Sequence, residues 1–124
     1  MTPVDQEFLA SDDGTVIGDC VRAATATILD MKREDVPHFV RDEPGADWVE
    51  TWENFIRKHG YEPIMIHGPR DRPPTPLGYY LATGMSPRDR RHMVVMHGGA
   101  VAHDPHPSRE GLTEIEAVWI LGNR

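Results

Sequence analysis

The stretch that decides the fold is GDCVRAATA at residues 18–26, which puts the only cysteine of the chain, Cys20, in the expected first turn of a helix. Asp19 is a residue type that caps helix N-termini with its carboxylate, and apolar residues follow it at helical spacing. A thiol in this turn lies near unpaired N–H groups and the positive end of the helix dipole, which favours the thiolate. The neighbouring carboxylate of Asp19 disfavours it. Cys20 is therefore either a nucleophile or a small buried residue.

Length and composition describe one acidic domain, residues 1–124, with 39% hydrophobic and 27% charged residues. The formal net charge of −7 disfavours binding to phosphate backbones. One cysteine excludes an internal disulfide and fits a reducing compartment. The N-terminus has no signal-peptide pattern, and no apolar run approaches the roughly 18 residues of a membrane helix. We expect a cytoplasmic protein without nucleic-acid or membrane partners; the oligomeric state is left open.

Two amphipathic segments predict helices in the first half of the chain. The first runs from Cys20 to about Met31. The second begins at Asp47, where Asp47 and Glu50 have the spacing of a capping box, and Gly60 closes it as a C′ residue. A loop separates the two helices. Apolar side chains on the second helix follow a wide stripe, which predicts core packing rather than a ligand platform; they are Trp48, Trp52, Phe55 and Ile56.

The second half of the chain has the pattern of strands joined by turns. A stiff proline-rich connection at 68–76 and a Gly98-Gly99 turn are the main breaks. The expected strands are residues 64–66, 77–83, 93–96, 100–102 and about 115–121. Helices that precede an antiparallel sheet predict an α+β fold.

Four histidines and one carboxylate lie between residues 92 and 106. In one interpretation Cys20 is a nucleophile, His92 takes its proton, and Asp104 orients the imidazole. In a second, His103, Asp104 and His106 hold a metal ion, although no fixed-spacing motif supports this. In the third, the histidines are ordinary surface and turn residues. We assign four others to that default: His38, His59, His67 and His97.

The hairpin around Gly98-Gly99 tests the triad, because side chains alternate along each strand. A strict two-residue turn opposes Met93 to Asp104 and points Asp104 away from His92. A three-residue loop opposes Val94 to Asp104, which puts Asp104 on the face of His92. The triad therefore requires an odd loop or a bulge.

Three motifs resemble the papain-like cysteine peptidases, in particular the branch of the bacteriocin-leader (double-glycine) peptidases. They are Gly18-Asp19-Cys20 at a helix start, His92-Met93-Val94-Val95, and Asp104-Pro105 at the end of a hairpin. Longer stretches around them are similar to small proteins of phage and bacterial genomes. The resemblance implies N-terminal helices packed on a C-terminal antiparallel sheet. It also implies that Cys20, His92 and Asp104 meet in the cleft between them.

One position departs from that family, which carries a glutamine or asparagine about six residues before the nucleophile as an oxyanion donor. This chain has Gly14 there. The backbone N–H of Cys20 then needs another donor, for which Thr15, a group near Asp13, or Gln6 are the candidates.

The loop before His92, residues 86–91, carries Arg88, Arg90 and Arg91. It is either a solvated turn or a basic lip for an acidic peptide segment, a carboxylate or a phosphate. We assign Arg88 and Arg91 to substrate binding.

Together these features predict a cysteine hydrolase, acting on a peptide, isopeptide or related amide bond without a cofactor or metal. The resemblance implies a peptide or protein substrate. The alternative is a weak or inactive binding module of the same fold that engages a host or partner protein. A transferase or deamidase would use the same acyl-enzyme.

Overall fold

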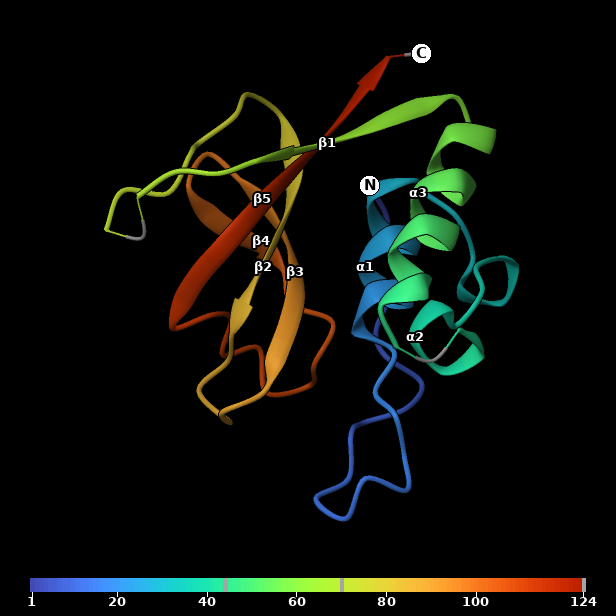
Figure 1. The fold of residues 1–124 in the computed structure, drawn as a ribbon. Helices are drawn as coiled ribbons and strands as arrows, with labels where there is room; N and C mark the ends of the chain where they lie inside the picture. The colour runs from blue at the N-terminus through green and yellow to red at the C-terminus, as the bar shows by residue number, and fades with distance from the viewer. Residues whose placement is uncertain (44, 70, 124) are drawn as a thin grey trace.

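The computed structural model describes residues 1–43, 45–69 and 71–123, which form a helical layer packed against a sheet (Figure 1). The predicted α+β class is confirmed. The helices are α1 (Cys20–Ile28), α2 (Phe39–Asp42) and α3 (Trp48–Lys58), with short 3₁₀ turns at Arg33–Asp35 and Gly45–Asp47. The strands are β1 (Tyr61–Ile66), β2 (Tyr79–Met85), β3 (Arg91–His97), β4 (Ala100–His103) and β5 (Glu114–Asn123).

The sheet has the order β1-β5-β2-β3-β4, and every neighbouring pair is antiparallel. All five predicted strands exist, although their ends differ by a few residues. The last strand of the sequence, β5, inserts between β1 and β2, which sequence pattern alone did not predict. In the predicted proline-rich connection at 68–76, Arg70 lies outside the described residues.

The first helix differs from its prediction at both ends. It ends at Ile28 rather than near Met31, and Asp30 follows with a positive φ of 56°. Asp19 precedes it, but the predicted side-chain cap is wrong. The carboxylate of Asp19 accepts hydrogen bonds from the backbone of Glu7 and Phe8 instead.

The helical segment around α2 and α3 corrects two further predictions. Part of the expected loop forms the short helix α2, which begins after the buried His38. The capping box at Asp47 is wrong, since Asp47 makes no side-chain cap bond to the described residues of α3. Gly60 follows the C-cap His59 with a φ of 94°, as predicted for a C′ glycine.

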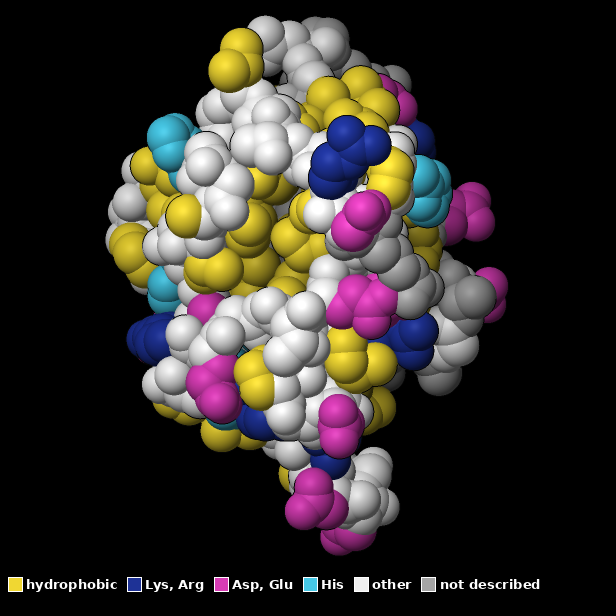
Figure 2. All heavy atoms as spheres, turned by 90° about the vertical axis from the view of Figure 1, so that its left-hand side faces the viewer, with side chains coloured by type: hydrophobic (Ala, Val, Ile, Leu, Met, Phe, Trp, Pro, Cys, Tyr) yellow, Lys and Arg dark blue, Asp and Glu magenta, His cyan; other side chains and the backbone are white. Residues whose placement is uncertain are grey.

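Two apolar clusters stabilise the sheet, one on each face. The first lies between the layers and confirms the predicted stripe of α3: Trp52 and Ile56 are fully buried, with Trp48 and Phe55 packed against them. The second, around Tyr80 and Val118, lies on the other face. Figure 2 shows apolar side chains gathered in a hollow on that side. The first cluster positions the site, because it joins α1 to β3.

Gly84 of β2 lies where the register with β5 shifts, opposite His92 of β3. A Cβ at this position would lie 1.8 Å from the carbonyl oxygen of Glu114, so the backbone would have to move. We expect Gly84→Ala to lower the free energy of unfolding by about 1–3 kcal/mol, the usual cost of overpacking. Urea denaturation measures this. Gly122→Ala is the matched control, since its Cβ would meet only ordinary contacts; equal stability of the two variants would contradict the prediction.

None of the helices in the described part of the chain combines the length and the apolar character of a membrane span.

Candidate active site

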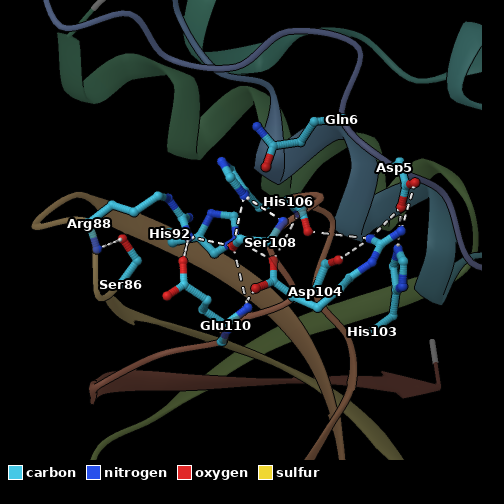
Figure 3. Close-up of polar contacts among 12 residues, drawn as sticks. Asp5, Gln6, Ser86, Arg88, His92, His103, Asp104, His106, Ser108 and Glu110 are labelled. Atoms are coloured by element: carbon cyan, nitrogen blue, oxygen red, sulfur yellow. Dashed lines mark hydrogen bonds and ion pairs between the residues drawn. The ribbon is translucent and has the colours of Figure 1, made fainter.

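The site is built around His92, which is the second residue of β3 and is buried, with 6% of its surface exposed. Its Nε2 atom lies 2.6 Å from Oδ1 of Asp104 (Figure 3). This nitrogen donates the hydrogen bond, because an ionised carboxylate can only accept. The imidazole is therefore oriented by a carboxylate 12 residues further along the chain.

A β-bulge brings these two side chains together. His97 opposes Ala100 and Met96 opposes Val101, as in the strict two-residue turn that would separate the pair. The register then shifts, and Val95 opposes His103. The extra residue in β4 turns Asp104 to the face of His92. The predicted requirement for an odd loop or a bulge is thus met by a bulge.

The carboxylate of Asp104 is enclosed by donors. Besides His92 it accepts the backbone N–H of His106 at 2.9 Å and that of Gly111 at 2.7 Å. Burial alone would raise the pKa of this carboxyl group, but the hydrogen bonds from His92, His106 and Gly111 hold it well below its usual range. Asp104 is therefore ionised at neutral pH.

Cys20 begins α1 and is partly buried, and its side chain lies close enough to His92 to raise the pKa of that imidazole. Because Nε2 faces Asp104, Nδ1 is the nitrogen left for the sulfur. Burial lowers the pKa of His92, but the interactions with Asp104 and Cys20 outweigh it and raise that pKa to about 9. The three predicted catalytic residues meet, and the protonated form of His92 is stabilised at neutral pH.

The carboxylate of Asp19 is turned away from the sulfur into the N-terminal segment. It is fully buried and accepts from the backbone of Phe8 at 2.9 Å and of Glu7 at 3.3 Å, with Arg22 at 3.5 Å. Its charge is therefore compensated by these donors. The sequence argument that this anion disfavours a thiolate at Cys20 loses most of its force.

Cys20 and His92 open into a cavity of about 990 Å³ between the helical layer and the sheet. One end is apolar and includes Trp48, Trp119 and Met65. The other end is polar and is formed by the loop before α1 together with the turn between β2 and β3. A substrate in this cavity would lie across the nucleophile and the imidazole.

Gln6 lies in this cavity, beside the histidines (Figure 3). Its backbone N–H donates to the carbonyl of Pro105 at 3.1 Å, and its Nε2 donates to the carbonyl of Phe8 at 3.0 Å. Within the described residues its Oε1 atom is buried without a hydrogen-bond partner. A Cβ on Gly18 would lie 3.3 Å from Nε2, so the amide packs directly on the backbone that leads to Cys20.

Two predicted oxyanion residues lie elsewhere. Asp13 and Thr15 are exposed at the tip of the loop before α1 and do not line the described cavity. The Asp13 carboxylate accepts bonds from Ser11 and from the backbone and hydroxyl of Thr15, which closes the loop on itself. Their role is structural, because short polar side chains favour such local turns. The sequence signal for Gln6 was only that the chain has few side-chain amides.

The arginine lip does line the cavity, but its charges are compensated. Arg88 donates to Ser108 and lies 3.5 Å from Glu110, and Arg91 pairs with Glu116 at 3.1 Å. The predicted basic lip is thus a set of ion pairs at the cavity rim.

Two histidines have structural roles that the sequence did not show. His38, expected at the surface, is buried, and its ring bonds to the carbonyl of Ile17 and the N–H of Arg41. His103 is buried and bonds to the carbonyl of Val4. Among residues 1–43, 45–69 and 71–123, no group of three or more His, Cys, Asp or Glu side chains could hold a metal ion. The metal interpretation has no support.

Comparisons with protein-family models, with curated proteins and with solved structures find no match to this chain. The functional argument therefore rests on the site itself.

Proposed function

We propose that this protein is a cysteine hydrolase of compact papain-like architecture that cleaves a peptide or related amide bond. The observation that carries the proposal is the 2.6 Å hydrogen bond from His92 to the ionised Asp104, in a cavity that Cys20 also lines and where Cys20 raises the pKa of the same imidazole. A nucleophile, a base and a group that orients the base are the parts that covalent catalysis needs. The burial of the hydrogen-bonded pair supports the same function, because His92 and Asp104 are each less than a tenth exposed to solvent.

In the proposed mechanism the Cys20 proton resides on Nδ1 of His92, and the thiolate attacks the substrate carbonyl carbon. The carbonyl π electrons move to oxygen and form a tetrahedral oxyanion. When the oxyanion collapses, the C–N bond breaks and His92 gives its proton to the leaving nitrogen. Neutral His92 then takes a proton from water, whose oxygen attacks the thioester; the C–S bond breaks, which releases the acid and restores the Cys20 thiolate beside protonated His92. Asp104 holds the imidazole in the required tautomer throughout.

We assign the side-chain oxyanion donor to Gln6, in place of Asp13 and Thr15. Its amide is buried beside the backbone of Gly18, and its Oε1 atom has no hydrogen-bond partner among the described residues, so only one bond holds the amide in its present orientation. Rotation of the amide by half a turn would put Nε2 where Oε1 lies, at the cost of the bond to Phe8. The backbone N–H of Cys20 is the second donor.

Gln6→Ala is expected to lower kcat by about 10²–10³-fold, the usual effect of losing one oxyanion donor. The substrate KM should change little, because the donor acts mainly on the transition state. Gln6→Glu keeps the size but removes the N–H, so it should be as slow. Asn54→Ala, an exposed amide on α3, is the matched control. A full-rate Gln6→Ala variant would exclude this assignment.

The direct test of the proposal is turnover of an internally quenched peptide-amide library, followed by mass spectrometry of the protein under acid quench. A hydrolase should release new N-termini and carry an acyl adduct on Cys20, and the Cys20→Ala variant should do neither. A reducing buffer is required, which fits the proposed cytoplasmic setting. A binding module would retain peptides without cleavage in both proteins.

A further inference from the structure

Arg90 is the arginine of the lip that reaches across to the helical layer. Its Nη2 atom donates to the carbonyl of Ser11 at 3.1 Å and to Oδ1 of Asp12 at 2.9 Å. Ser11 and Asp12 belong to the loop before α1, 79 and 78 residues away in the sequence. Arg90 and Asp12 both line the polar end of the cavity that holds Cys20. Their ion pair therefore bridges the two walls beside the nucleophile.

Both ends of this bridge are anchored. On the sheet side, the backbone N–H of Ser86 donates to the carbonyl of Arg90 at 2.8 Å, and Ser86 is buried. On the helical side, the N–H of Ser11 donates to the carbonyl of Val16 at 3.1 Å. Arg90 directly precedes β3, and His92 is the second residue of that strand. The backbone at both ends of the bridge is thus held by hydrogen bonds, close in sequence to His92.

The partner of this guanidinium is replaceable. The Asp12 side chain is fully exposed, and that of Arg90 is 39% exposed. Exposed ion pairs contribute little to stability. Arg88 and Arg91 differ, because they pair with carboxylates of the sheet layer, Glu110 and Glu116. A guanidinium prefers a carboxylate that it can hold with two parallel hydrogen bonds, whereas Asp12 supplies one bonded oxygen.

We propose that Arg90 binds the terminal carboxylate of a substrate, which exchanges with Asp12. The inference rests on the proposed hydrolase function and names its substrate class. A terminal carboxylate always lies on the leaving-group side of the scissile bond. Since Arg90 lies within the cavity of Cys20, the scissile bond must be close to that end of the peptide. The substrates are peptides cleaved near the C-terminus, and Asp12 is an internal competitor for their carboxylate.

The charge balance of the lip favours this class over a long acidic segment. Arg88, Arg90 and Arg91 are each paired, so the rim offers no excess positive charge to a polyanion. When a substrate carboxylate replaces Asp12 at Arg90, one exposed ion pair breaks and one new ion pair forms. A single carboxylate can make that exchange without any other rearrangement of the rim.

The test measures binding to the Cys20→Ala protein, in which no bond is cleaved. All three tryptophans line the cavity, so intrinsic fluorescence reports its occupancy. The probes are N-acetylated Phe-Ala and Phe-Ala-Ala peptides, each as the free acid and as the C-terminal amide. We expect the acids to bind about tenfold tighter. Arg90→Gln should remove the difference, and Asp12→Asn should increase it several-fold by removing the competitor.

Arg72→Gln, an exposed arginine outside the cavity, is the control and should keep the tenfold difference. Unfolding midpoints of the variants show that they are folded. Equal binding of the acids and the amides overturns the inference. It is also overturned if an amidated peptide with an aspartate side chain binds as tightly as a peptide with a free terminal carboxylate. Hydrolysis by the unmodified protein is scored separately: a retained acid preference without turnover contradicts the hydrolase and leaves the carboxylate site.

Discussion

His92→Gln is expected to abolish hydrolysis almost completely, with a fall in kcat of about 10⁴-fold or more. Removing one member of a catalytic triad usually has an effect of this size, because the remaining members depend on it. Glutamine can still bond to Asp104, which limits the structural damage, but it cannot carry the proton of Cys20. The measurement is the initial rate on a cleaved peptide from the library.

The same variant should change the chemistry of Cys20 in the absence of any substrate. An ordinary thiol with a pKa of about 8.5 is only about 0.3% thiolate at pH 6. With the pKa of His92 raised to about 9, the imidazolium persists at pH 6 beside the side chain of Cys20. We expect iodoacetamide to alkylate Cys20 about 100-fold faster than a free peptide thiol at pH 6. The His92→Gln variant should fall to the free-peptide rate.

Two controls separate the ion pair from simple accessibility. His97→Gln, an exposed histidine at the far end of the same strand, should leave the rate unchanged. Above pH 9 the wild-type and His92→Gln rates should converge, because His92 has then lost its proton. An alkylation rate of Cys20 that already follows an ordinary thiol titration in the wild-type protein would contradict the proposed pair.

The fold was predictable where local pattern determines it. The apolar stripe of α3 and the Gly98-Gly99 turn each depend on residues near in sequence. The insertion of β5 between β1 and β2 depends on pairings of strands far apart in the chain, which periodicity does not encode. One of the two wrong caps has a visible physical cause. That cause is visible at Asp19, whose carboxylate is taken by the tertiary N–H donors of Glu7 and Phe8.

The proposed triad of Cys20, His92 and Asp104 was predictable as a set of residue types, while its geometry was not. The hairpin pattern showed that Asp104 could reach His92 only after a change of register. It could not show that the change is a bulge near Ala102 rather than a longer loop. Gln6 was missed as the leading donor because the N-terminal segment reaches the site through hydrogen bonds between residues far apart in the sequence. The N–H of Gln6 donates to the carbonyl of Pro105, and the N–H of Phe8 donates to the carboxylate of Asp19.

The pKa values of the pair determine how stability should depend on pH. The pKa of His92 is raised, so its contribution is complete below the unfolded value of about 6.5 and is lost as the pH rises toward 9. The pKa of Asp104 is lowered, so its contribution is present above about pH 4 and is lost as the pH falls further. Between about pH 4 and 6.5 both contributions are complete.

Asp104→Ala is expected to lower the free energy of unfolding by about 3–5 kcal/mol at pH 6, since it breaks a buried, hydrogen-bonded charge pair. It leaves His92 and the backbone N–H groups of His106 and Gly111 without their acceptor. Activity should fall by about 10⁴-fold in the fraction that remains folded. Urea denaturation and peptide cleavage below the unfolding midpoint measure the two effects.

Asp104→Asn separates charge from packing, because it keeps the size of the side chain and its single oxygen can still accept from one of the two backbone N–H groups. This variant should recover about half of the lost stability and little of the activity, since a neutral amide stabilises neither the tautomer nor the imidazolium of His92. The stability of the wild-type protein should fall between pH 6.5 and 9, whereas that of Asp104→Asn should stay flat there. A wild-type curve as flat as that of the variant would mean that His92 is not protonated in the folded protein. The proton transfer to the leaving nitrogen would then lack its donor.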